Sequence, residues 1–196
     1  MGMSDKQPVE LRELVRLSFA EPENGFRAVQ ALTLPITARW MLLGVAVLAG
    51  VVLAYILPVM TGQAEEMFAP FTFAIGQAGF NILAVLLLDR VGRMFGGTGS
   101  FEDAVLLVGW LQLLMAGLQG VQLLVMLVLP PLGALVLIVA IAAFFWMFSG
   151  FTCALHGFES RFMVLMAAFG TLFAVAFVVS LVMIILGVQI PGMEDV

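Results

Sequence analysis

Long runs of apolar residues occupy most of the chain, and the polar residues gather in the short segments between them. A helix needs roughly 20 apolar residues to cross the hydrocarbon core of a bilayer, and each run is close to that length. Helices satisfy their own backbone hydrogen bonds in lipid, whereas a β-barrel would need an alternation of polar and apolar residues that is absent here. The pattern predicts an all-α integral membrane protein, a bundle of five transmembrane helices at residues 40–60, 70–88, 104–129, 132–155 and 162–188.

The segments between these spans carry turn and capping signals. Pro130-Pro131 separates the third and fourth spans with almost no loop, which predicts a tight antiparallel hairpin. Ser100 is placed to cap the third span, with Glu102 and Asp103 in its first turn. Acidic groups there suit the free N–H groups and the dipole of a helix start. The glycine-rich residues before Ser100 are therefore expected to form a turn that leads into a capped helix.

The basic residues fall on one side of a five-span arrangement. Five precede the first span, two lie between the second and third, and one lies between the fourth and fifth: Lys6, Arg12, Arg16, Arg27, Arg39, Arg90, Arg93 and Arg161. The other connections and the C-terminal tail contain acidic residues and no Lys or Arg. Because positively charged loops are retained in the cytoplasm, we predict a cytoplasmic N-terminus and a C-terminus on the opposite side.

Composition agrees with this class of protein. Hydrophobic residues make up 63% of the 196 residues and charged residues only 11%. A domain of this size has too little interior to hide so much apolar surface, which leaves lipid as the surrounding medium. The formal net charge of -5 argues against a nucleic-acid partner. One cysteine, Cys153, excludes a disulfide within the chain.

Residues 1–39 form a predicted cytoplasmic segment with an amphipathic helix, ahead of a transmembrane domain at 40–188 and a short tail at 189–196. Residues 9–19 place Leu11, Leu14 and Val15 on one helical face. That face would either insert shallowly into the membrane surface or pack on the protein itself. Glu21-Pro22-Glu23 is expected to start a second short helix that carries Phe26, Val29 and Leu32 at three-residue spacing.

Amide side chains are the main polar groups inside the predicted spans: Gln77, Asn81, Gln112, Gln119 and Gln122. Gln77 and Asn81 are four residues apart on the second span, and Gln112 and Gln119 are seven apart on the third, so each pair shares a helical face. We expect these amides to bond across a helix interface. The alternative is a polar pathway for a small solute, although no charged residue of the kind common in coupled transporters lies well inside a span.

No residue has the pattern of a catalytic group, and no cofactor or metal is expected. Cys153, His156 and Glu159 recur at three-residue spacing, but zinc requires a fourth ligand, and the ordinary interpretation is a helix end that emerges among lipid headgroups. An intramembrane enzyme would depend on Cys153 or His156, and neither has an orienting partner in the sequence. The glycines at 96–99 lack the Lys-Ser/Thr ending of a phosphate-binding loop.

Three short motifs resemble the Yip family of Ypt/Rab-GTPase-interacting membrane proteins and their bacterial relatives. Gly97, Gly99, Ser100 and Phe101 match the Gly-x-Gly-Ser-Phe loop that opens the third helix of that family. Glu21-Pro22-Glu23, followed by Phe26, is similar to the Asp-Pro…Phe stretch of bacterial members, and His156-Gly157 is similar to the short loop before the last helix. The resemblance covers about residues 20–188 and includes the order and spacing of the spans.

The resemblance implies a five-span fold with a cytoplasmic N-terminus. Together with the lack of a catalytic set of residues, it favours a non-enzymatic protein of a bacterial inner membrane that organises membranes or binds other proteins. Eukaryotic members bind prenylated small GTPases, but the Asp-Leu-Tyr-Gly-Pro motif associated with that role is absent here, which argues against GTPase binding. The expected partners are the lipid bilayer and other membrane proteins or a second copy of the chain. The predicted cytoplasmic interaction surface comprises Arg12, Arg16, Arg27, Arg90, Arg93 and Arg161. A small-solute transporter or channel subunit is the alternative function.

Overall fold

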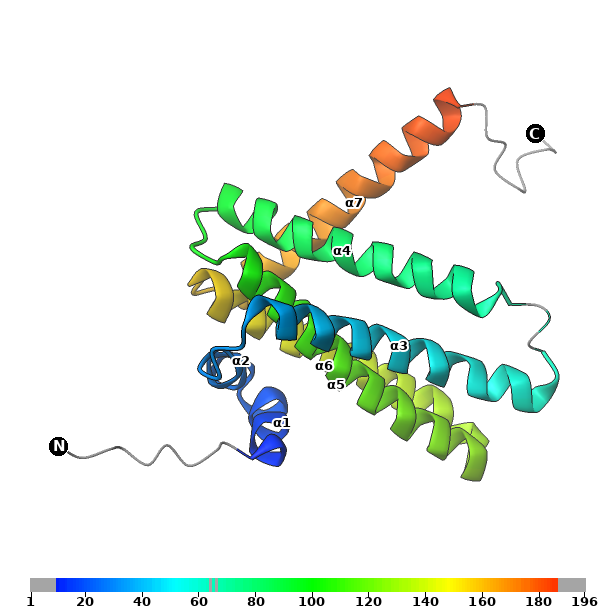
Figure 1. The fold of residues 1–196 in the computed structure, drawn as a ribbon. Helices are drawn as coiled ribbons and strands as arrows, with labels where there is room; N and C mark the ends of the chain where they lie inside the picture. Colours follow the sequence, from blue (N-terminus) through cyan, green and yellow to red (C-terminus); the bar gives the residue numbers. More distant parts are fainter. Residues whose placement is uncertain (1–9, 64, 66, 187–196) are drawn as a thin grey trace.

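A computed structural model describes residues 10–63, 65 and 67–186. The described chain contains helices and no strand, and Figure 1 shows their arrangement. Two short helices, α1 (Leu11–Ala20) and α2 (Pro22–Gln30), precede five long ones. The long helices are α3 (Ile36–Thr61), α4 (Pro70–Met94), α5 (Phe101–Val128), α6 (Gly133–His156) and α7 (Arg161–Ile185), and a short 3-10 helix at Pro130–Leu132 joins α5 to α6.

Five of these helices are long and apolar enough to cross a membrane, which confirms the predicted all-α bundle. The first and third spans begin earlier than predicted, at Ile36 and Phe101, and α4 continues past residue 88 to Met94. The reason is that hydropathy marks only the lipid-facing part of a span, whereas a helix continues until a cap, proline or glycine ends it. Lys6, Val9, the tail at 189–196 and the last two residues of the fifth predicted span lie outside the described residues.

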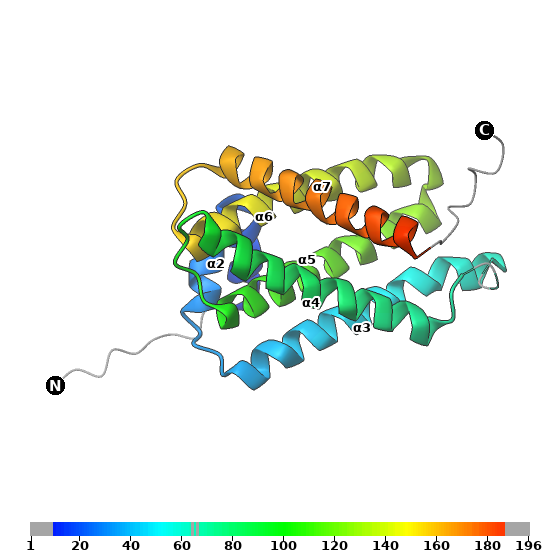
Figure 2. The ribbon, with the colours of Figure 1, turned by 90° about the horizontal axis from the view of Figure 1, so that it is seen from above.

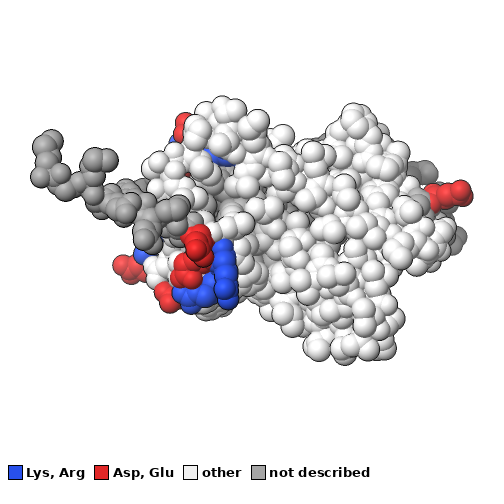
Figure 3. Space-filling model, turned by 60° about the horizontal axis from the view of Figure 1, so that its bottom comes forward, with Lys and Arg blue, Asp and Glu red and all other residues white. Residues whose placement is uncertain are grey.

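The connections divide the bundle into two ends. One end holds α1, α2, the 95–100 loop and the turn between α6 and α7, and all seven arginines lie there; we call it the basic end. The α3–α4 connection and the Pro130–Leu132 turn lie at the other, far end. Acidic residues accompany the arginines at this end, and the middle parts of the long helices carry no charged residue. Figure 3 shows both charge signs together at the basic end and a smaller acidic patch at the opposite end.

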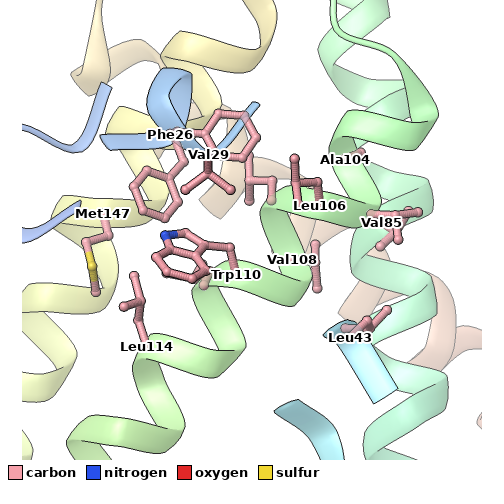
Figure 4. Close-up of a cluster of buried hydrophobic side chains, with 14 of the residues drawn as sticks. Phe26, Val29, Leu43, Val85, Ala104, Leu106, Val108, Trp110, Leu114 and Met147 are labelled. Atoms are coloured by element: carbon pink, nitrogen blue, oxygen red, sulfur yellow. The ribbon is translucent and has the colours of Figure 1, made fainter. Parts of the chain in front are cut away.

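The packed core lies in the half of the bundle next to the basic end. Residues 104–111 of α5 are all buried, so this stretch is enclosed on every side. Its neighbours are α3, α4, α6 and the two short helices, and Phe26, Val29 and Met147 surround Trp110 (Figure 4). Toward the far end the long helices expose their apolar side chains, as expected for surfaces solvated by lipid.

Helices α3 and α5 pack closely where they cross. A Cβ atom on Gly109 would lie 3.1 Å from the backbone nitrogen of Leu43, so only glycine fits without displacing a neighbour. Ala46 is buried on the same face of α3, one turn further along. Small residues at such crossings bring helix backbones together and increase dispersion contacts. The sequence pattern had not distinguished Gly109 from the other glycines.

The predicted cap of α5 is present. The Ser100 hydroxyl oxygen accepts a hydrogen bond from the backbone N–H of Asp103 at 3.1 Å, and the hydroxyl donates to the Asp103 carboxylate at 2.8 Å. Arg39 donates to the other oxygen of that carboxylate at 2.6 Å, which joins the start of α3 to the start of α5. The cap is therefore part of an interhelical contact as well as a local signal.

Replacing Ser100 with alanine is expected to reduce the free energy of unfolding by about 1 kcal/mol, because the Asp103 N–H loses its acceptor. The measurement is the thermal unfolding midpoint of the purified protein in detergent. Ser180→Ala is the matched control, since Ser180 is exposed on α7. Equal midpoints for the two variants would contradict the capping role.

Candidate functional site

His156, the last residue of α6, is the centre of the basic end. Its side chain is only 3% exposed. The imidazole Nε2 lies 3.1 Å from the carbonyl oxygen of Leu88 on α4, and Nδ1 accepts from the backbone N–H of Gly99 at 3.2 Å. With Nε2–H donating to that carbonyl, this is one neutral tautomer of the ring. One side chain therefore bridges α6, α4 and the 95–100 loop. At this helix end the imidazole itself is enclosed by the protein.

Glycines make room for this imidazole. A Cβ atom on Gly97 would lie 2.5 Å from Nδ1, one on Gly99 would lie 2.7 Å from the Leu155 side chain, and one on Gly92 would overlap the ring. The backbone N–H of Thr98 also donates to the His156 carbonyl oxygen at 3.2 Å. The glycine-rich loop is thus fixed against α6, and Gly97 and Gly99 leave the space that the His156 and Leu155 side chains occupy.

Glycine at position 157 ends α6 in the left-handed conformation, with φ of 74°. Its backbone N–H donates to the carbonyl oxygen of Cys153 at 2.8 Å, and the N–H of Phe158 donates to the same oxygen at 3.1 Å. This arrangement satisfies the end of the helix and turns the chain toward α7. The Phe158 ring then stacks on His156, with a centroid separation of 5.4 Å.

Asp89 is the one buried acidic side chain among the described residues, at 2% exposure. Its Oδ2 accepts from Arg93 one helical turn later and lies 3.6 Å from Nε of Arg90. Its Oδ1 has no hydrogen-bond partner within the described structure. The carboxylate therefore lies in the packed end of the bundle, paired with arginines whose side chains are more exposed.

The second short helix docks on α6. Pro22 lies so close to Gly150 that a Cβ atom there would be 2.5 Å from the proline ring, and the Phe26 and Phe151 rings stack at 5.4 Å. Glu23 accepts from Arg161 at 2.9 Å. The predicted helix start at Glu21-Pro22-Glu23 is therefore correct, with Pro22 as the first helical residue. Leu32 is exposed and lies beyond the end of α2, contrary to its expected place on the apolar face.

The first short helix packs on the protein, which selects one of the two alternatives for its apolar face. Leu14 is buried, and the Ser18 hydroxyl accepts from the Trp110 indole N–H at 2.9 Å. The Trp146 indole N–H donates to the Phe19 carbonyl oxygen at 2.9 Å. Leu11 remains 64% exposed at the start of the helix. The helix is thus held by the bundle through two tryptophans that its own pattern does not reveal.

Two of the five amide side chains, Asn81 of α4 and Gln112 of α5, bond across a helix interface as predicted. Gln112 donates to the Asn81 side-chain oxygen at 2.6 Å, and Asn81 donates to the Gln77 backbone oxygen at 2.8 Å. The side chains of Gln77 and Gln119 both approach Gly50 of α3, at 3.7 and 3.9 Å from the point where a Cβ atom on that glycine would lie. Gln122 is half-buried one turn further along α5. The Asn81–Gln112 bond joins two helices, which is the structural role expected of such amides.

Replacing Asn81 or Gln112 with leucine is expected to destabilise the protein modestly, because each change leaves the other amide without its partner. The double variant should lose less than the sum of the single losses. Bonds of this kind average about 0.6 kcal/mol in double-mutant cycles. The measurement is a cycle of unfolding free energies in detergent or bicelles. Strict additivity would show that the two amides do not interact.

The arginines of the predicted interaction surface have different surroundings. Arg161 pairs with Glu23 and lies over the Trp146 ring at 4.4 Å, and Arg93 pairs with Asp89. Arg16 donates to Glu13, and that hydrogen bond lowers the pKa of the exposed Glu13 carboxyl. The side chain of Arg90 is 76% exposed. Arg12 and Arg27 are also exposed on the short helices.

Metal and catalytic chemistry receive no positive support from this arrangement. Cys153 and His156 are both buried, and Glu159 is exposed beyond the end of α6. Within the described residues no group of three or more His, Cys, Asp or Glu side chains is placed to hold a metal ion. The buried polar groups of the basic end instead bond to helix ends and loops, which fixes the relative positions of the elements.

The fold and the apolar surfaces of its five long helices define a multi-pass integral membrane protein. Comparisons with protein-family models, with curated proteins and with solved structures found no match to this chain.

Proposed function

We propose that the chain is a Yip-like, non-enzymatic membrane organiser or adaptor of a bacterial inner membrane, with the basic end in the cytoplasm. The supporting observation is that three motifs far apart in the sequence converge on the last three turns of α6. Pro22 and Phe26 pack on Gly150 and Phe151, and the 96–100 loop packs on His156. Motifs that share a structural purpose are a stronger argument for the resemblance than three separate short matches.

The short helices provide the surface for partner binding in this proposal. They are docked by Glu23–Arg161, Ser18–Trp110 and Phe19–Trp146, so their outward face has a defined shape. Leu11, Arg12 and Arg27 are exposed on that face. A preorganised surface loses little conformational entropy when a partner binds, which suits an adaptor.

Site-specific photocrosslinking in native membranes tests the adaptor role. A photoreactive residue at position 11, 12 or 27 should yield discrete adducts of higher mass. The same residue at position 68 is the control, because Phe68 is also exposed but lies at the far end. Adducts with another protein or with a second copy only from the basic end support the proposal. Recovery of the lone chain from every position at native expression would contradict it.

Reporter fusions test the proposed orientation separately. Fusions after Gly97 and Glu159 should report the cytoplasm, and fusions after Gln63 and Pro131 the other side of the membrane. The physical reason is that loops with arginine resist translocation. The reverse pattern would place the short helices outside the cell and would remove the cytoplasmic adaptor role.

A further inference from the structure

A cleft of about 380 Å³ opens between α4 and α7 and is floored by α5 and α6. Figure 2 shows α4 and α7 in front of α5 and α6. The lining is almost entirely apolar and rich in phenylalanine, and the Asn81–Gln112 pair forms a small polar part of its wall. Helix α7 packs mainly on α6, and most of its residues are exposed, so the cleft faces the medium around the long helices.

The length of the cleft is that of one membrane leaflet. It extends along α4 from Phe80 to Gly92, which spans about 18 Å at the rise of an α-helix, and it continues to Phe95 just after the helix. Along α7 it extends from Met163 to Val175, about 18 Å. Half of a bilayer measures roughly 20–22 Å with its headgroup region and about 15 Å in its hydrocarbon core.

The cleft also lies at the depth along the spans that one leaflet is expected to occupy. Phe95 and Phe158, which line one end, lie in the connections at the basic end, where a headgroup region is expected. Phe80 and Val175 lie near the middle of their spans. Arg90 is exposed on α4 one turn after the lining residue Leu87, on the side of the basic end, where its guanidinium is available to a lipid phosphate.

From this geometry we infer that the cleft is a binding site for one acyl chain of a phospholipid in the leaflet at the basic end. An unfilled apolar cleft forfeits dispersion contacts along its whole lining, and a bilayer supplies hydrocarbon chains at its mouth. The inference concerns the α4–α7 cleft, which is separate from the short-helix surface used by the proposed function. Phospholipid retention therefore does not depend on whether a protein partner exists.

Lipid retention by the purified full-length chain tests the site. Native mass spectrometry after extraction from phosphatidylethanolamine-containing membranes should detect a phospholipid bound to the wild-type protein. Ala168→Phe fills the cleft from α7 and should reduce retention about tenfold, which corresponds to about 1.4 kcal/mol of binding free energy. Ala174→Phe is the matched control, because Ala174 is exposed on α7 and does not line the cleft.

A second measurement uses the unmodified protein. A phospholipid with a photoreactive group near the middle of its acyl chain should label cleft residues such as Phe148 and Ala84 in preference to outward-facing ones such as Ile141. Labelling without that preference would overturn the inference. Equal phospholipid retention by the Ala168→Phe and Ala174→Phe variants would overturn it as well. Occupation by a neighbouring protein helix would overturn it too, and would be seen as a polypeptide crosslink from the cleft.

Discussion

Replacing His156 with alanine is expected to cost about 3–5 kcal/mol of folding free energy. The Gly99 N–H and the Leu88 carbonyl oxygen would each lose a buried partner. Leaving a buried polar group unsatisfied costs roughly 1–3 kcal/mol, and the vacated space beside Gly92 and Gly97 adds a cavity term. The thermal midpoint in detergent should fall accordingly, and the α4–α5 loop should become sensitive to protease.

Two conservative variants separate the hydrogen bonds of His156 from its bulk. Asparagine can accept from the Gly99 N–H in place of Nδ1, and glutamine can donate to the Leu88 carbonyl oxygen in place of Nε2, so both should be intermediate in stability. Glu159→Ala is the surface control, since Glu159 is exposed. If alanine at 156 is as stable as this control, His156 does not hold the three elements together.

Replacing Gly25 with alanine is expected to separate the two short helices. The added Cβ atom would lie 2.6 Å from both Cα and N of Ser18, and backbone atoms cannot yield as a flexible side chain can. Overpacking of this kind typically costs about 1–3 kcal/mol, and here relief requires α1 to move away from α2. Displacement of α1 would also break the hydrogen bond between Ser18 and Trp110.

Cys153 provides a native reporter for this change. It is the only cysteine in the chain, and it is buried on α6, two residues after Phe151, on which Phe26 of α2 stacks. Maleimide reaches Cys153 when the short helices open. Lowering the free energy of that opening by about 1.4 kcal/mol raises the rate of labelling about tenfold. Gly44→Ala is the matched control, because nothing lies within 4 Å of its added Cβ atom. Equal labelling of the two variants would show that the added Cβ atom at position 25 does not open the contact between α1 and α2.

Hydropathy and local turn chemistry were sufficient to predict the five spans, the hairpin at Pro130-Pro131 and the Ser100 cap. A bilayer requires every backbone group of a span to bond within its own helix, so length and apolar content alone identify the spans. The cap is equally local, since Ser100 and Asp103 are three residues apart. Helix ends were less predictable, because α4 continues past its apolar run to Met94.

The interior of the bundle was decided by the tertiary structure. In a membrane protein, lipid-facing and buried positions are both apolar, so no periodicity distinguishes the enclosed residues 104–111 of α5 from the exposed residues of α7. His156 finds its partners 57 and 68 residues away along the chain, and Trp110 finds Ser18 at a separation of 92. Such pairings depend on how the helices cross, and only the assembled bundle brings them together.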